Sequence, residues 1–444
     1  MPRGLAAVPR QADLPTMHLV WHRADLRTHD HPALAAAAGA GTTVGLVVLD
    51  PAHETTSLRR RALVLAHVRA LRAAYARLGG TLLVRSGDAA HVLPQVCDEL
   101  RCLQVHALRS HTPRGRARDQ RCATLLPGLT WHDGRYVRAP GTLHTRAGRP
   151  FAVFGAYYRA WRERPAPEPL EAPTRIETPA LEGISAGEIP GLESDVPLPA
   201  AGEAAALRAL RAFIEEGAPG YAQRRDRLDG SGSSRLSIWL RVGALSARTA
   251  AAALWERPGA GPQKWLAELA WRDFLADLLH HRPELVDHAF QPRWDAFAWS
   301  RDEADFAAWR DGRTGIPAID AAMRELRATG WISNRARMLA AQFLAKHLRI
   351  DWRRGERVFR DWLLDADTAS NVGNWQWAAG LGIDNAPYFR VFNPVTQAAQ
   401  HDPDGAWLGR WVPESGGDPR PLPGAIVDLA EARRAYLAAA EEVA

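Results

Sequence analysis

Cysteine, lysine and long apolar runs are scarce in this 444-residue chain. Its three cysteines, Cys97, Cys102 and Cys122, are odd in number and show no Cys-x-x-Cys spacing. They give no disulfide framework or zinc site and too few thiolates for a four-cysteine iron–sulfur cluster, and they fit a reducing cytoplasm. No apolar run reaches the roughly 18–20 residues that span a bilayer. We expect a cytoplasmic protein with no bound metal and no membrane partner.

Lysine is nearly absent. Of the 56 basic residues, only Lys264 and Lys346 are lysines, and the others are arginines. The net charge of +6 permits a polyanionic partner such as nucleic acid. An arginine-rich genome would produce the same composition. A non-enzymatic, arginine-rich nucleic-acid-binding protein is therefore one open interpretation.

The first third of the chain alternates short apolar runs with amphipathic segments. The pattern predicts strands at 18–23, 42–50, 81–85 and 103–108, and helices at 31–38, 57–78, 88–100 and 114–125. Such alternation is typical of a doubly wound parallel sheet. No Gly-x-Gly-x-x-Gly follows the first strand, so the dinucleotide fingerprint is absent. We expect the main cofactor to bind elsewhere.

The rest of the chain divides into a connector and a helical region. Eight prolines lie between residues 165 and 200, which predicts an irregular surface segment. Helical periodicity follows, most clearly at 265–280, 316–329, 333–348 and 356–364. The fold prediction is an α/β doubly wound parallel-sheet domain followed by an all-α domain. The predicted boundaries are an N-terminal extension at 1–16, the α/β domain at 17–131, the connector at 132–202 and the helical domain at 203–444.

Tryptophan is abundant, and 14 of the 17 residues lie from Trp239 onward. A large helical core would explain many of them. Residues 360–377, however, combine three tryptophans with three acidic residues and two asparagines. A hydrophobic core does not need those polar groups, whereas a site for a polar, planar, redox-active molecule could use them.

Three further segments carry polar residues that could belong to a site. The Gly/Ser run at 230–237 precedes a short helix. This pattern is typical of an anion-binding loop at a helix N-terminus, but also of a plain linker. At 265–272, Glu268 and Trp271 share a helical face, although Glu268 and Arg272 also have the spacing of a surface ion pair. At 330–338, Arg335 points away from the helical face that carries Arg337.

Taken together, these segments resemble the DNA photolyase/cryptochrome family over residues 19–430, and most closely its class I cyclobutane pyrimidine dimer photolyases. The resemblance is carried by Ser233–Ser237, Trp265–Arg272, Gly330–Met338, Leu364–Asp367, Asn374–Trp377 and Pro387–Pro394. It implies a deoxyribodipyrimidine photolyase, a lyase that holds FAD in its helical domain. In that family, electron transfer from excited reduced FAD splits the cyclobutane ring of a lesion flipped out of UV-damaged DNA.

The resemblance also implies which residues hold FAD. Arg337 and Asp365 are expected to form an ion pair, and Asn371 to face flavin N5. A neutral amide there favours a repair enzyme that works from anionic reduced FAD. The implied FAD-binding residues are Tyr221, Ser233, Ser234, Arg235, Leu236, Ser237, Trp265, Arg272, Asn334, Arg337, Asp365, Asp367 and Asn371.

Catalytic and lesion-binding roles follow from the same resemblance. The implied catalytic residues are Glu268, Asn371 and an electron path to the surface through Trp375, Trp352 and Trp299. The implied substrate-binding residues are Glu268, Trp271, Asn334, Arg335, Met338, Trp377 and Arg390. Arg335 and Arg390 are expected to meet phosphates. Met338, in a segment without histidine, favours cyclobutane dimers over (6-4) lesions.

A second chromophore is less clearly indicated. Folate-carrying members have Asn-Glu before Arg-x-Arg-Asp, where this chain has Arg114 and Gly115. We expect a flavin or deazaflavin type in the N-terminal domain rather than folate, or no second chromophore. Within the family, the alternative is a cryptochrome-type blue-light photoreceptor. The lack of a long tail after Pro423 weighs against it. We expect a monomer with no obligate protein partner.

Overall fold

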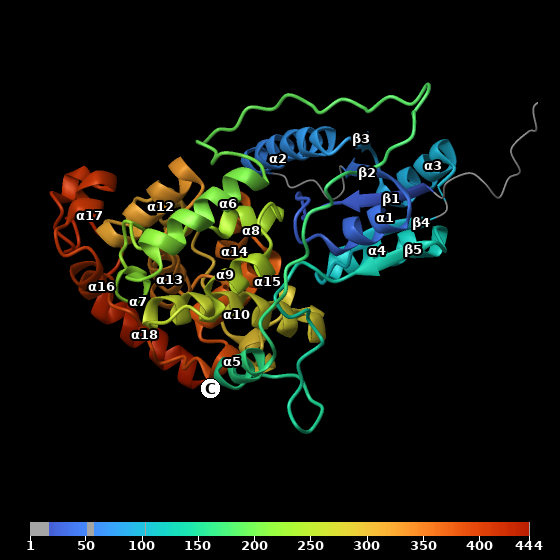
Figure 1. Ribbon diagram of the computed structural model, residues 1–444. Coiled ribbons are helices and arrows are strands. Elements are labelled where there is room, and N and C mark those ends of the chain that lie inside the picture. The colour runs from blue at the N-terminus through green and yellow to red at the C-terminus, as the bar shows by residue number, and fades with distance from the viewer. Residues whose placement is uncertain (1–16, 51–56, 103, 444) are drawn as a thin grey trace, which may run out of the picture.

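The computed structural model describes residues 17–50, 57–102 and 104–443, so the predicted extension at 1–16 lies outside the described residues. Figure 1 shows an α/β domain, coloured blue to cyan, beside a larger helical domain coloured green to red. The predicted fold class, a parallel-sheet domain followed by a helical domain, is confirmed.

The sheet is wholly parallel, with the strand order β3-β2-β1-β4-β5. The predicted strands are present as β1 (Met17–His22), β2 (Thr42–Leu49), β3 (Thr81–Ser86) and β4 (Gln104–Leu108). The sequence analysis missed β5 (Leu129–His132), a four-residue, half-exposed edge strand with little apolar patterning.

Helices cover both faces of the sheet because successive strand side chains point to opposite sides. Val20 packs with α1 (Pro32–Ala40) and α2 (Leu58–Arg77), whereas Leu19 packs with α3 (Ala89–Leu100) and α4 (Pro113–Leu125). The strand order reverses between β1 and β4. In open α/β sheets, ligands bind outside the carboxyl ends of the strands at such a switch point.

The connector contains one helix, α5 (Phe154–Glu163), which packs against α10 of the helical domain. Residues 164–202 form no helix or strand, as expected for proline-rich sequence. This stretch returns past the sheet, where the Val84 amide on β3 donates to the Ala186 carbonyl at 2.9 Å. Figure 1 shows it as the long green loop beyond α2.

The helical domain has a hydrophobic core of its own, built mainly from its helices. No helix among the described residues is long and apolar enough to span a membrane. Helix α13 continues as a single π-helical turn at Phe343–His347. The α-helices are α6 (Glu203–Ala212), α7 (Tyr221–Arg224), α8 (Ser237–Val242), α9 (Ala247–Trp255), α10 (Ala260–His281), α11 (Glu303–Arg310), α12 (Pro317–Thr329), α13 (Asn334–Gln342), α14 (Trp352–Trp362), α15 (Thr368–Ala379), α16 (Pro394–His401), α17 (Ala406–Trp411) and α18 (Leu429–Glu441).

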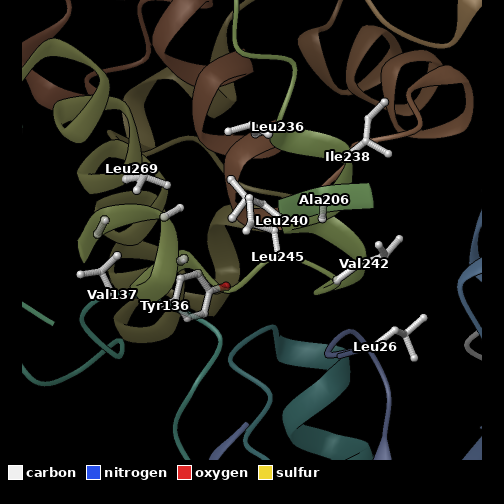
Figure 2. Close-up of a cluster of buried hydrophobic side chains, with 14 of the residues drawn as sticks. Leu26, Tyr136, Val137, Ala206, Leu236, Ile238, Leu240, Val242, Leu245 and Leu269 are labelled. Carbon is white, nitrogen blue, oxygen red and sulfur yellow. The ribbon is translucent and has the colours of Figure 1, made fainter. Parts of the chain in front are cut away.

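A continuous apolar cluster joins the two domains around α8. Figure 2 shows Val242 of α8 toward Leu26 of the α/β domain, and Leu240 of α8 toward Tyr136 of the connector. Buried Arg27 reinforces the junction, because its guanidinium donates to the Gly134 and Gly243 carbonyls at 2.8 and 3.1 Å. The junction fixes α8, which begins at the end of the Gly/Ser run.

Candidate functional site

A cavity of about 380 Å³ opens between α8, α10, α13 and α15. It brings together most of the residues that the sequence predicted: Tyr221, Ser233, Ser234, Arg235, Ser237, Trp265, Glu268, Trp271, Arg272, Asn334, Arg337, Met338, Asp365, Asp367 and Trp377. A deeper recess of about 80 Å³ shares Arg337 and Asp365 with it and adds Asn371 and Trp375. Cofactor-type and lesion-type residues therefore line one continuous region.

The Gly/Ser run forms one wall of the cavity. A Cβ on Gly232 would lie 1.9 Å from the Arg224 carbonyl oxygen, so only glycine allows this close approach. The Ser234 hydroxyl accepts from the Trp265 indole at 3.1 Å, which ties the run to α10. Arg235 stacks its guanidinium 4.4 Å from the Trp331 ring centroid. Leu236 differs from its neighbours, because its side chain is buried in the hydrophobic core and does not line the cavity.

The predicted Arg337–Asp365 pair is confirmed, with an Nη2–Oδ2 distance of 2.9 Å. Arg337 is also held by its Nε, which donates to the Ile332 carbonyl at 3.0 Å. The second carboxylate oxygen, Asp365 Oδ1, is buried and has no hydrogen-bond partner among the described residues. Buried polar atoms are nearly always paired, so this oxygen on the cavity wall fits the donor of a bound cofactor.

Asp367 caps the N-terminus of α15, where its side chain accepts from the Ser370 amide at 3.2 Å. Burial alone would raise the pKa of Asp367, but Arg135, Arg272 and Arg241 outweigh it and hold the pKa at about 2. Arg135, whose Nη2 lies 3.1 Å from Asp367, comes from the connector. The sequence analysis missed it because no local pattern links residue 135 to residue 367.

Asn371 is oriented by a buried glutamate. Its amide nitrogen donates to the Glu356 carboxylate at 2.8 Å and to the Glu356 carbonyl at 3.0 Å. The amide oxygen is thereby left as the acceptor, as the predicted contact with a protonated flavin N5 requires. Burial raises the pKa of Glu356. Glu356 lies one turn of α14 beyond Trp352 and was not predicted.

Glu268 is paired with two cations at the cavity mouth. It accepts a short hydrogen bond from Arg225 and lies 3.6 Å from the Lys264 ammonium. The alternative of a surface pair with Arg272 is wrong, because Arg272 instead donates to the Arg135 carbonyl at 3.0 Å. Arg225 was missed, although it lies one helical turn after Tyr221, on the same face.

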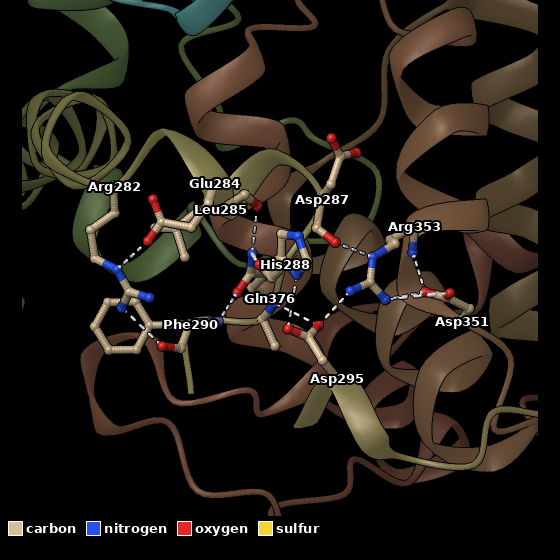
Figure 3. Close-up of polar contacts among 11 residues, drawn as sticks. Arg282, Glu284, Leu285, Asp287, His288, Phe290, Asp295, Asp351, Arg353 and Gln376 are labelled. Atoms are coloured by element: carbon tan, nitrogen blue, oxygen red, sulfur yellow. Dashed lines mark hydrogen bonds and ion pairs between the residues drawn. The ribbon is translucent and has the colours of Figure 1, made fainter. Parts of the chain in front are cut away.

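Trp271 and Trp377 line the mouth of the cavity. Trp271 is fixed from behind by Phe154, whose ring is stacked on it at a centroid distance of 3.9 Å and an angle of 11°. Trp377 is fixed through its neighbour Gln376. As Figure 3 shows, the Gln376 amide nitrogen donates to the Leu285 and His288 carbonyls, at 2.8 and 2.9 Å.

The three predicted electron-path tryptophans lie on adjoining segments. Trp375 lines the deep recess, and a Cβ on Gly355 of α14 would meet its ring at 2.1 Å. Trp352 starts α14, one turn before Gly355. Trp299 precedes Ser300, whose amide donates to the carbonyl of residue 349 at 2.6 Å. Trp375 and Trp352 are buried, whereas Trp299 is partly exposed, so the series runs from the recess toward the surface.

The two arginines predicted to meet phosphates lie outside the cavity. Arg335 lines an adjacent open groove of about 780 Å³ and is paired with Asp226 at 2.9 Å. Arg390 is exposed in the turn that follows α15.

A second cavity, of about 660 Å³, lies between the domains at the sheet's switch point. Four carboxylates and nine arginines line it, namely Asp25, Glu356, Asp361 and Asp367 with Arg23, Arg60, Arg109, Arg114, Arg118, Arg135, Arg241, Arg357 and Arg360. Of this lining, the sequence had pointed to Arg114 and Gly115 for a second chromophore and to Asp367 and Asn371 for FAD. The excess of arginine suits an anionic ligand.

One group among the described residues has metal-ligand spacing: His22, Asp25 and His31. Each imidazole nitrogen already has a partner. His22 contacts the Tyr75 hydroxyl at 2.7 Å and the Asp25 carbonyl at 3.2 Å. His31 contacts the Asp25 carboxylate at 3.2 Å and accepts from the Leu34 amide at 3.1 Å. Hydrogen bonding accounts for this group without a metal.

Comparison with known proteins agrees with this geometry. The family model for DNA photolyase matches residues 18–174, and that for the FAD binding domain of DNA photolyase matches residues 265–421. A deoxyribodipyrimidine photo-lyase of Thermus thermophilus is 50% identical over 426 residues, which cover 96% of this chain and 99% of that protein.

Solved structures give the same assignment. A bacterial class III photolyase from Agrobacterium tumefaciens matches with a TM-score of 0.88 and 31% identity, covering 99% of each chain. An archaeal photolyase from Sulfolobus tokodaii with two FAD molecules matches with a TM-score of 0.83 and 27% identity, covering 96% of this chain and 100% of that chain. The present chain belongs to the DNA photolyase family, and its helical domain is an FAD-binding domain.

Proposed function

We propose that this protein is a deoxyribodipyrimidine photolyase that repairs cyclobutane pyrimidine dimers in UV-damaged DNA with light. The observation that carries the proposal is the single cavity, which has cofactor-type residues at its depth and lesion-type residues at its mouth. When bound and reduced, FAD supplies on illumination the electron that splits the cyclobutane ring, and it recovers that electron afterward.

The inner residues hold the cofactor. The unpartnered Asp365 oxygen would accept a hydrogen bond from FAD, and the hydroxyls of Ser233 and Ser237 on the cavity wall would be donors for its phosphates. The Asn371 amide oxygen would be the acceptor for flavin N5, because Glu356 occupies the amide nitrogen. An acceptor at that position favours the reduced, protonated flavin that repair requires.

The outer residues hold the lesion. Trp271 and Trp377 offer apolar ring faces to the dimer, and stacking contributes about 1–3 kcal/mol per base. Glu268 accepts from an imide N–H of the dimer. Arg225 and Lys264 beside Glu268 stabilise the negative charge that the dimer carries after it receives the electron. A dimer stacks poorly in the duplex, so extruding it costs less than extruding a normal base pair.

The surroundings complete the site. Arg335 and Arg390 meet phosphates outside the cavity, which makes binding dependent on salt. With oxidised FAD bound, Trp375, Trp352 and Trp299 would form a path along which an electron from a reductant in solution could reach it from the surface. Met338 on the cavity wall favours cyclobutane dimers, as in the class I enzymes.

The inter-domain cavity is the proposed site of a second chromophore. Nine arginines and its place at the switch point suit the phosphate of a flavin-type molecule. A chromophore there would absorb light and pass the excitation on to FAD. We further propose that the enzyme acts as a cytoplasmic monomer, which the reduced cysteines and the completeness of the site within one chain support.

The test uses reduced, FAD-loaded protein and an oligonucleotide that carries one thymine dimer. Blue light should restore the thymines, and darkness should not. Glu268→Gln should lower the yield per absorbed photon about fivefold or more, because a neutral amide accepts more weakly than a carboxylate. The matched control is Glu256→Gln, on an exposed residue at the end of α9.

Two outcomes would contradict the proposal. A FAD-loaded protein that changes its absorption in light without repairing dimers would favour the cryptochrome-type photoreceptor. A purified protein that binds DNA but retains no flavin under any condition would favour the non-enzymatic DNA-binding protein.

A further inference from the structure

Lys346 is an unusual residue in this molecule. It is one of only two lysines in the chain, and it is 1% exposed. Among the described residues, no carboxylate forms an ion pair with it. Burial of a charged group without a counter-charge costs folding free energy, so its contacts require an explanation.

The Lys346 ammonium binds backbone instead. Nζ donates to the Tyr388 carbonyl at 3.1 Å and to the Arg390 carbonyl at 2.8 Å. It also lies 5.7 Å from the centroid of the Tyr436 ring on α18. Lys346 belongs to the π-helical turn that extends α13, the helix that carries Asn334, Arg337 and Met338.

The segment that Lys346 holds is a surface turn. The Arg390 amide donates to the Pro387 carbonyl at 3.2 Å, which closes the turn. The carbonyls of the turn face Lys346, while the side chains of Phe389, 61% exposed, and Arg390 face outward. Gln342, one helical turn before Lys346, accepts from the Phe392 amide at 3.0 Å. The end of α13 thus fixes three backbone groups of this segment.

The turn packs against the end of α15, the helix whose Trp377 lines the cavity. Gly380 ends α15 three residues after Trp377, with φ of +77°. A Cβ on Gly380 would lie 2.8 Å from the Tyr388 Cα and 3.2 Å from Lys346 Nζ. Glycine is therefore required where the turn packs against the end of α15.

We propose that Lys346 is a positioning residue for DNA binding, which fixes the Pro387–Arg390 turn so that Arg390 meets a phosphate beside the lesion. The inference rests on the proposed function, because it assigns a role within DNA recognition. A turn that is ordered before binding does not lose conformational freedom when DNA arrives, so the contact binds more tightly. Lys346 itself touches neither FAD nor DNA.

The chemistry of Lys346 allows this role to be separated from stability. Burial, followed by the nearby charge of Arg390, lowers the pKa of Lys346 to about 7. Methionine has similar length but no charge and no N–H donor. Lys346→Met therefore removes the two carbonyl contacts and, at the same time, the cost of the buried charge, so the two effects on folding oppose each other.

The experiment measures the affinity of the full-length holoprotein for dimer-containing DNA at several salt concentrations. Lys346→Met should weaken binding about fivefold and lower the salt slope by about 0.9, the loss of one phosphate contact. The FAD content, the photoreduction rate and the repair yield of saturated complexes should not change. In an Arg390→Met background, Lys346→Met should produce no further loss, because Lys346 acts through Arg390.

Two outcomes would overturn the inference. One is an unchanged affinity for dimer-containing DNA and an unchanged salt slope in Lys346→Met. The other is a further loss of affinity when Lys346→Met is added to Arg390→Met. If Lys346→Met does not fold, Gln342→Met removes the third contact to the same segment, and unchanged DNA affinity in that variant overturns the inference. Wild-type protein that repairs dimers while Lys346→Met binds normally would refute the positioning role alone. Wild-type protein that neither binds nor repairs dimers would refute the proposed function.

Discussion

The two large cavities of this protein meet at Asp367, which lines both, but they are built differently. The helical-domain cavity draws its walls from a few short segments. Its six cations outnumber its three carboxylates, and each carboxylate forms an ion pair: Glu268 with Arg225, Asp365 with Arg337 and Asp367 with Arg135. The inter-domain cavity collects residues from both domains, and nine arginines outnumber four carboxylates on its walls. The first site therefore suits the FAD and the lesion of the proposed function, whereas the second suits an anionic ligand.

Removal of the central ion pair should affect the first cavity most. Asp365→Asn leaves Arg337 without its counter-charge. Because Arg337 is partly exposed, the expected loss of folding free energy is moderate, about 2 kcal/mol. The variant should also lose most of the bound FAD. The ratio of flavin to protein and urea unfolding measure both effects. Asp418→Asn, in the exposed Asp418–Arg420 pair, is the matched control and should change neither. Full FAD content in Asp365→Asn would contradict the assignment of this cavity.

The electron path can be tested at its inner end. Trp375→Phe should slow the photoreduction of bound FAD at least about tenfold, which corresponds to a barrier increase of roughly 1.4 kcal/mol. Chemically reduced protein should still repair dimers. Trp309→Phe is the control, because Trp309 contacts Trp375 at a centroid distance of 6.1 Å but lies outside the predicted path. Equal photoreduction in wild type and Trp375→Phe would refute the path.

In the second cavity, loss of a single arginine should weaken ligand binding, and the effect should be smaller than the two effects expected in the first cavity. Arg114→Gln should weaken the binding of flavin mononucleotide, used as the probe, about three- to tenfold, because one charge-assisted contact is lost. Fluorescence titration of FAD-loaded protein measures this affinity. Arg116→Gln is the control, since Arg116 is exposed on the same helix and outside the cavity lining. Identical affinities in the two variants would mean that the cavity does not bind the flavin phosphate.

The smallest effect is expected at the groove beside the first cavity. Asp226 lies 3.6 Å from Arg225 and 2.9 Å from Arg335, and so keeps a negative charge on the DNA-binding face. Asp226→Asn should raise the affinity for undamaged DNA about two- to threefold, because a negative charge is removed and Arg335 becomes available to phosphates, while Arg225 stays paired with Glu268. Asp229→Asn, which lies outside this groove, is the control. Weaker binding by Asp226→Asn would show that the carboxylate orients the arginines instead.

The sequence predicted the parts of this molecule that depend on local pattern. The parallel sheet and its helices followed from apolar periodicity, and the Arg337–Asp365 pair from a family resemblance carried by short motifs. The edge strand β5 was missed because four half-exposed residues carry no alternating pattern.

Long-range contacts explain the rest of what was missed. Arg135 reaches Asp367 across 232 positions, and Glu356 orients Asn371 across 15. Neither spacing has a signature in a single sequence. Arg335 was predicted correctly to point away from Arg337, but its ion pair with Asp226 depends on how α13 packs beside the segment after α7. Such pairings are set by tertiary packing, and local propensity does not encode them.

The proposed function requires FAD and the lesion to share one cavity. The direct measurement is the fluorescence of reduced FAD in the holoprotein while dimer-containing or undamaged oligonucleotide is added to saturation. Because electron transfer to an adjacent dimer competes with emission, the account predicts strong quenching by the dimer and little by undamaged DNA. Equal fluorescence with both oligonucleotides, at saturating binding, would contradict the shared cavity.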